Sequence, residues 1–179
     1  MALSHAILAT LVGQTASGYD LRKQFEGSVG FFWQASFQQI YRELGKLEDQ
    51  GYVRSQTVHQ ENRPDKKLYE VTDTGKTYLG DWISQSCEMA PIKDDLLVKV
   101  FAGYLVPKAV MVKELEHHRT QHLERLQVYR TLEQRFFSPA EHLTPDDQFR
   151  YMTLSYGIRY ETGWLAWCEE AIAVLGATS

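Results

Sequence analysis

Residues 36–74 read SFQQIYRELGKLEDQGYVRSQTVHQENRPDKKLYEVTDT. Apolar residues spaced three, four and three apart lie on one face of an expected helix: Phe37, Ile40, Leu44 and Leu47. Gly51 follows at the place where a left-handed cap residue ends a helix. Residues 52–59 and 68–72 are rich in β-branched and aromatic residues and favour two strands. The order helix, strand, basic turn, strand predicts a winged helix.

Further helices are expected on both sides of this stretch. Residues 2–12 are a compact apolar run with leucine and isoleucine at helical spacing. Ser17 is suited to cap a second helix, whose buried face is expected to hold Leu21 and Phe25. Thr72 is suited to cap a fourth helix with these apolar residues: Tyr78, Leu79, Trp82 and Ile83.

The second half of the chain looks helical throughout. Residues 88–95 contain a proline and are the expected joint between the two halves. Residues 95–105 favour a short helix, and residues 107–137 contain no helix breaker, so roughly 30 residues can form a rod of about 45 Å. Thr144, followed by two aspartates, is expected to open a final helix.

These patterns predict a mainly α fold with two domains. We expect an N-terminal winged helix-turn-helix domain with a two-stranded wing in residues 1–87, and an all-helical C-terminal domain in residues 88–179. The C-terminal domain is expected to serve dimerisation and effector binding.

Net charge is low for a nucleic-acid-binding protein. The chain sums to −4, with −1 in residues 1–85 and −3 in residues 86–179. Attraction to DNA therefore depends on local clusters of cations, in the expected turn at Arg63, Lys66 and Lys67 and on the second helix at Arg22 and Lys23.

Several function classes lack support in the sequence. No apolar run approaches the roughly 20 residues that span a bilayer, and the N-terminus lacks the features of a signal peptide. No GxSxG motif or phosphate-binding glycine-rich loop is present, so we expect neither enzymatic activity nor a cofactor. Cys87 and Cys168 are expected to be reduced, small core residues of a cytoplasmic protein.

Histidines raise the question of a metal site. His118 and His122 lie four residues apart on one helix face, with His117 adjacent. Two imidazoles need further ligands to hold a metal ion, and no spacing supplies them. We therefore expect solvated or interface histidines and no bound metal.

The third helix carries residue types suited to reading DNA bases. Ser36, Gln38, Gln39 and Arg42 lie in its first two turns, where helices of this type contact bases. Glutamine pairs with adenine and arginine with guanine. The alternative is an ordinary solvated helix face, but the basic hairpin that follows favours DNA binding. We expect substitution of Gln39 by alanine to relax base preference.

The expected wing and second helix carry candidates for backbone contacts. Arg63, Lys66 and Lys67 can reach phosphates or the minor groove, which positions the protein without reading sequence. Lys23, on the expected second helix, is a further candidate. Tyr19 can donate its hydroxyl to a phosphate or cover the edge of the core. The alternative for the wing is a charged turn that keeps the protein soluble.

One face of the last helix predicts a dimer. Its leading residues are Phe149, Met152, Tyr156, Tyr160, Trp164 and Trp167. Gly157 and Gly163 are expected to let another helix approach closely. The alternative is a monomeric helical bundle. A pocket for a flat effector is also possible, although a dimer core is the simpler interpretation. The candidates to line it are Phe101, Tyr104, Tyr156, Tyr160, Trp164 and Trp167.

The same segments resemble the PadR family of bacterial transcriptional regulators. The resemblance is carried by SGYDL at 17–21, IYRELGKLEDQGYV at 40–53 and RPDKKLYEVTDTGK at 63–76. VFAGYLVP at 100–107 and YETGWLAWCEEAIAVL at 160–175 resemble the larger members, which have an all-helical C-terminal domain.

The resemblance implies a homodimer that binds a palindromic double-stranded operator, usually as a repressor, and in some members releases it on binding a small aromatic compound. It places Tyr19 and Tyr41 on the DNA backbone. It also places Gln38 and Gln39 on the helix face that reads bases. The wing residues that it implies are Arg63, Lys66 and Lys67. Arg42 stands where the family commonly has proline, so it can add a contact.

A rival hypothesis is a winged-helix protein-interaction module that does not bind DNA directly, as the negative net charge suggests. The operator, the effector, its binding residues, the regulated genes and the choice between repression and activation are left open by the sequence.

Overall fold

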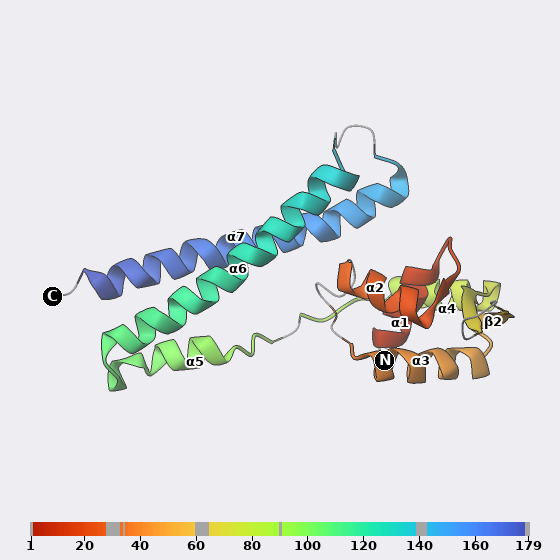
Figure 1. The fold of residues 1–179 in the computed structure, drawn as a ribbon, viewed down its shortest axis with the longest axis horizontal. Helices are drawn as coiled ribbons and strands as arrows, with labels where there is room; N and C mark the ends of the chain where they lie inside the picture. The colour runs from red at the N-terminus through yellow and green to blue at the C-terminus, as the bar shows by residue number, and fades with distance from the viewer. Residues whose placement is uncertain are drawn as a thin grey trace. The chain divides into compact units, whose positions relative to one another are not determined.

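The computed structural model describes residues 2–27, 33, 35–59, 65–89, 91–138 and 143–177. Contacts within the chain divide it into two compact units, Met1–Met89 and Ala90–Ser179. Each unit is mainly helical (Figure 1). Among the described helices, none combines the length and apolar character required to span a bilayer.

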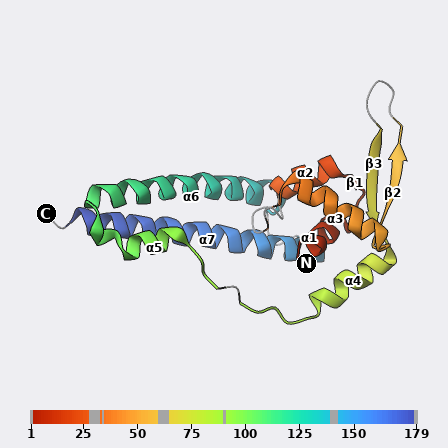
Figure 2. The same cartoon turned by 90° about the horizontal axis from the view of Figure 1, so that it is seen from below.

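The first unit contains helices α1, α2, α3 and α4 and a small antiparallel sheet. Its elements are α1 (Ala2–Leu11), β1 (Ala16–Ser17), α2 (Gly18–Gly27), α3 (Phe37–Asp49), β2 (Val53–Val58), β3 (Lys66–Val71) and α4 (Asp73–Ile83). The strand order is β1-β3-β2, and β2 and β3 extend side by side as the expected wing (Figure 2). The register pairs Val53 with Val71 and Val58 with Lys66. The short strand β1, which pairs Ala16 with Tyr69, was not predicted.

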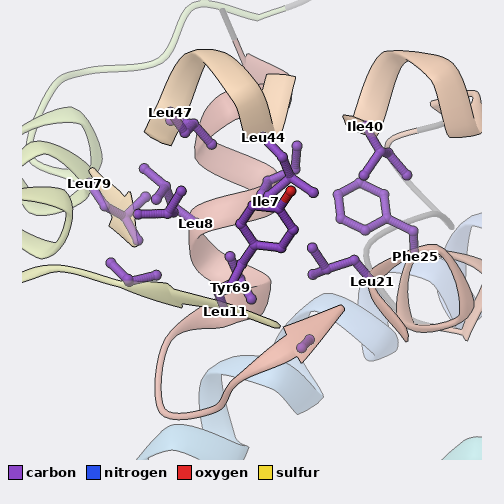
Figure 3. Close-up of a cluster of buried hydrophobic side chains, with 13 residues drawn as sticks. Ile7, Leu8, Leu11, Leu21, Phe25, Ile40, Leu44, Leu47, Tyr69 and Leu79 are labelled. Atoms are coloured by element: carbon purple, nitrogen blue, oxygen red, sulfur yellow. The ribbon is translucent and has the colours of Figure 1, made fainter. Parts of the chain in front are cut away.

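Helices α1, α2 and α3 share one apolar core (Figure 3). The core residues are Ile7, Leu8, Leu11, Ala16, Leu21, Phe25, Ile40, Leu44, Leu47, Val53, Tyr69, Val71 and Leu79. The predicted buried faces of α2 and α3 are confirmed except at Phe37, which is 43% exposed. Phe37 is the first residue of α3, where it packs on Tyr41 at the surface, with ring centroids 4.4 Å apart.

Local hydrogen bonds define where the helices begin and end. Ser17 and Asp20 cap each other's backbone N–H groups at the start of α2, at 3.1 and 3.2 Å. Thr72 accepts from the N–H of Gly75 at the start of α4, as predicted. Gly51 has φ +74°, the left-handed conformation that was expected after α3.

The second unit is built on a long antiparallel helical hairpin. It contains α5 (Asp95–Phe101), a 3₁₀ turn η2 (Gly103–Leu105), α6 (Lys108–Phe136) and α7 (Pro145–Gly176). Figures 1 and 2 both show α6 and α7 running side by side. The predicted rod is confirmed as α6, and Thr144 caps α7 by accepting from the N–H of Asp147. The expected helix 95–105 is shorter, because its last turn is the 3₁₀ turn.

The face of α7 that meets α6 differs from the predicted apolar face. The buried residues of α7 are Leu154, Ile158, Glu161 and Cys168. Gly157 does allow close approach, but of Tyr129 in the same chain: an added Cβ would lie 3.0 Å from its ring. At Gly163, among the described residues, nothing apart from the neighbouring residues and backbone of its own helix lies within 4 Å of such a Cβ. Cys168 is buried as expected, whereas Cys87 is exposed, so its prediction as a core residue was wrong.

Candidate nucleic-acid interface

The start of α3 is held by a reciprocal capping box. The Ser36 side chain accepts from the N–H of Gln39 at 3.2 Å, and the Gln39 side-chain oxygen accepts from the N–H of Ser36 at 2.7 Å. These bonds satisfy two of the backbone donors that the first turn of a helix leaves unpaired. A bidentate contact to adenine needs both the oxygen and the nitrogen of an amide. In this arrangement the oxygen of Gln39 already takes part in the cap, whereas its nitrogen makes no hydrogen bond within the described residues.

Three further side chains on the first two turns of α3 face solvent. Gln38 and Arg42 are exposed and form no side-chain hydrogen bond or ion pair within the described part of the chain. Tyr41 is 40% exposed and lies over the backbone of Gly18, where an added Cβ would collide with its ring. The glycine therefore lets α2 and α3 approach closely at their N-terminal ends, which sets candidate base-reading and phosphate-contacting residues side by side.

The start of α2 contributes two candidates for backbone contacts. Tyr19 is 57% exposed, and the Lys23 ammonium lies 6.0 Å from the centre of its ring. The Arg22 guanidinium lies 5.9 Å from the ring of Phe37 on α3. These distances are at the outer limit of a cation–π contact. They place cationic and aromatic groups of α2 next to the first turn of α3.

The wing lysines lie on a strand, not in the turn as predicted. Lys66 and Lys67 are the first two residues of β3, because the ladder with β2 continues to Val58 and Lys66. Lys66 forms an ion pair with Asp20 at 2.9 Å, and Lys67 forms one with Glu48 at 2.7 Å. Arg63 lies outside the described residues.

Both carboxylates are stabilised in their charged form. Hydrogen bonding from Lys66, and then from Ser17, holds the pKa of Asp20 below its usual range. Hydrogen bonding from Lys67, and then from Ser55, does the same for the pKa of Glu48. Both carboxylates are therefore ionised at neutral pH, and each described wing lysine already has an anionic partner.

These carboxylate partners were missed in the sequence. Glu48 lies 19 residues before Lys67, so no helical or strand spacing connects them. Asp20, on α2, is likewise far in sequence from its partner Lys66 on β3. A further ion pair lies within the hairpin itself and joins Arg54 on β2 to Glu70, its direct cross-strand neighbour, at 3.0 Å.

The predicted dimerisation face of α7 is open to solvent in the single chain. Phe149 and Tyr156 are 69% and 68% exposed, and Met152 and Tyr160 are also exposed. Trp164 and Trp167 are half-buried, with ring centroids 5.2 Å apart. A run of large apolar side chains of this length is typical of an interface between proteins.

The proposed aromatic pocket is not enclosed by one chain. Phe101 and Tyr104 lie at the end of α5 and in η2, and they are 88% and 83% exposed. Tyr156, Tyr160 and Trp164 follow one another along α7 with centroid separations of 6.3 Å. The single chain therefore presents these residues as surface groups.

The two histidines of α6 contact different carboxylates of the second unit. His122 Nδ1 lies 2.5 Å from the carboxylate of Glu161, and its ring stacks on Trp164 at 4.9 Å. Arg125 lies 3.5 Å from the other oxygen of Glu161. His118 lies 4.0 Å from Glu114 instead. Within the described ranges, no group of three side chains is arranged to hold a metal ion.

Comparisons with known proteins cover nearly all of the chain. Residues 7–81 match the PadR-like family of transcriptional regulators. Residues 92–176 match the family that describes the C-terminal part of virulence activator alpha. Rv1176c of Mycobacterium tuberculosis, a probable transcriptional regulator, is 34% identical over 98% of this chain and 98% of its own.

A second relative is the negative transcriptional regulator PadR of Bacillus subtilis, 29% identical over 97% of each chain. Its structure in complex with operator DNA superposes with a TM-score of 0.85 at 27% identity, over 98% of this chain and 99% of that one. Its structure in complex with p-coumaric acid gives a TM-score of 0.80 at 26% identity, with the same coverages. This chain belongs to the PadR-like family of transcriptional regulators.

Proposed function

We propose that the protein binds an operator in double-stranded DNA as a homodimer, represses transcription there, and releases the DNA when a small aromatic effector binds. The observation that supports it is the surface formed by the starts of α2 and α3, with the exposed side chains of Gln38, Arg42, Tyr41 and Tyr19. The Lys66–Asp20 ion pair joins the wing to the start of α2. The operator complex of the Bacillus subtilis relative, with the same fold over the whole chain, supports this assignment.

We assign distinct roles to the residues of this surface. Gln38 and Arg42 read base edges, because they lie near the start of α3 and their side chains form no hydrogen bond or ion pair within the described residues. The contacts to the DNA backbone come from Tyr19, Lys23, Tyr41, Arg63, Lys66 and Lys67. Ser36 and Gln39 hold the first turn of α3 in place, and the amide nitrogen of Gln39 is left to donate to DNA.

We assign DNA binding to residues 1–87 and dimerisation to residues 88–179. The exposed stripe on α7, formed by Phe149, Met152, Tyr156 and Tyr160 with the adjoining Trp164 and Trp167, is the proposed contact with the second chain. A dimer presents two copies of α3, whose separation must match half-sites about one helical turn of DNA apart. An effector that changes this separation would release the operator. The p-coumaric acid complex of the relative makes that compound the first one to test.

The test is selection of bound sequences from a random DNA pool, followed by binding measurements on the selected duplex. Gln38→Ala is expected to lose preference at one base position in each half-site, a cost of about 1–3 kcal/mol. Gln50→Ala, at the other end of α3, is the matched control and should keep the full preference. A pool that yields no enriched sequence would contradict the proposal.

The rival function, a protein-interaction module without direct DNA binding, gains support from one observation. Both described wing lysines are neutralised by carboxylates of the same chain, which weakens the cationic character of the wing. Absence of binding to any duplex at low salt, by a protein that is dimeric and folded, would favour this rival.

A further inference from the structure

The Lys67–Glu48 pair is built from three elements of the first unit. Glu48 lies near the end of α3, and Lys67 on β3 donates to its Oε2 at 2.7 Å. Ser55 on β2 donates to the other oxygen, Oε1, at 2.5 Å. The carboxylate is therefore held in place by a hydrogen bond that does not depend on the lysine.

The Lys66–Asp20 pair repeats this arrangement on a different helix. Asp20 Oδ2 accepts from the N–H and the hydroxyl of Ser17, at 3.1 and 2.8 Å, as part of the cap of α2. The same oxygen lies 2.9 Å from the Lys66 ammonium. In both pairs a carboxylate on a helix, already hydrogen-bonded to a serine, forms an ion pair with a wing lysine.

The lysines remain within reach of a ligand. The side chain of Lys67 is 46% exposed and that of Lys66 is 38% exposed. Pairs with this much exposure are weak and are screened by salt. A carboxylate at this position presents one negative charge to the ammonium, as a DNA phosphate does. Binding of a phosphate to either lysine would therefore replace one anionic partner by another.

We propose that Glu48 and Asp20 are internal competitors for the wing lysines and limit the affinity of the wing for DNA phosphates. The inference rests on the proposed DNA-binding function. A lysine that is already neutralised adds little to sequence-independent binding, whereas an unpaired lysine adds a full phosphate contact. The two carboxylates thereby shift the balance of binding towards the bases read by α3, and they act as specificity-determining residues although they touch no base.

The test uses Glu48→Gln in the full-length protein. Glutamine keeps the size of the side chain and an oxygen that accepts from Ser55, but it removes the charge. Asp49→Asn is the matched control, because it makes the same change in net charge on the next residue of α3, which has no ion-pair partner within the described residues. The probe is a fluorescein-labelled duplex of mixed sequence, measured by anisotropy across a salt series.

Freeing one lysine should add a phosphate contact in each bound protomer. Glu48→Gln is then expected to steepen the slope of log K against log salt by about 0.9 for each bound protomer, and to tighten binding roughly fivefold for each bound protomer at about 0.15 M salt. Asp49→Asn should change the slope by far less. Equal effects of the two substitutions would overturn the proposal.

A double-mutant cycle identifies the lysine through which Glu48 acts. In a Lys67→Met background, Glu48→Gln should lose its effect on the slope, and a gain that persists there refutes the inference. Asp20→Asn with Lys66→Met provides a second, independent cycle if the first pair unfolds. Failure of the wild-type protein to bind any duplex would overturn the proposed function itself. Normal wild-type binding with no gain in the variants would overturn only the role of the carboxylates.

Discussion

Substitution of Gln39 separates a capping role from a base-reading role. The structure places its side-chain oxygen on the N–H of Ser36, so Gln39→Ala removes one half of the capping box while the hydroxyl of Ser36 keeps the other half. Gln39→Glu preserves the acceptor and adds a negative charge at the positive end of α3, where it is favourable. Both variants lack the amide nitrogen, and only Gln39→Glu keeps the acceptor of the cap.

The expected magnitude is modest, because both bonds of the box are exposed to solvent. Loss of a helix cap costs about 0.5–2 kcal/mol, and loss of half of a box at an exposed site belongs at the lower end, about 0.5–1 kcal/mol. That free energy corresponds to roughly a two- to fivefold increase in opening of the first turn. Gln39→Glu should match or slightly exceed the stability of the wild-type protein.

Amide hydrogen exchange is the direct assay. The N–H groups of Ser36 and of the first turn of α3 should exchange faster in Gln39→Ala and at the wild-type rate in Gln39→Glu. Binding to the selected duplex should weaken for Gln39→Ala without a change in base preference. Unchanged exchange together with loss of preference at one base position would refute the capping argument and restore the simple reading role.

Three further outcomes are expected. Gly75→Ala should destabilise the first unit by about 1–3 kcal/mol in thermal unfolding, because the new Cβ would collide with a backbone carbonyl; Gly80→Ala on the same helix has open space and should be neutral or stabilising. Tyr156→Glu should shift the protein from dimer to monomer in sedimentation, whereas the neighbouring exposed Thr153→Glu should not. The pKa of Glu48 is lowered in the folded state, so its contribution to stability is present above its usual value of 4.5 and is lost as the pH falls below it; the melting temperature of Glu48→Gln should therefore fall less on acidification than that of the wild type.

Much of the fold follows from short-range patterns. The buried faces of α2 and α3 apart from Phe37, the caps at Ser17 and Thr72, and the left-handed Gly51 were all predictable, because each depends on residues within one or two turns. The unbroken run that forms α6 was equally clear. The strand β1 was not, since two residues carry no periodicity and pair only because β3 lies beside them.

The choice of the buried face on α7 shows where local patterns fail. The helix carries two stripes, and the one with more aromatic residues is exposed. The stripe that packs against α6 includes Glu161, which is 2% exposed. A carboxylate interrupts an apolar pattern, so its burial is understandable only from the partners His122 and Arg125 on the other helix.

The sequence by itself determined the succession of helices and strands, the family, and the residue types available for reading DNA, because these depend on spacing along the chain. Only the tertiary structure decided which charged groups form ion pairs and which polar side chains cap helices. Lys67 pairs with Glu48, Lys66 pairs with Asp20, and Gln39 caps the start of α3. The physical reason is that ion pairs form between groups brought within about 4 Å by folding, whatever their separation in sequence.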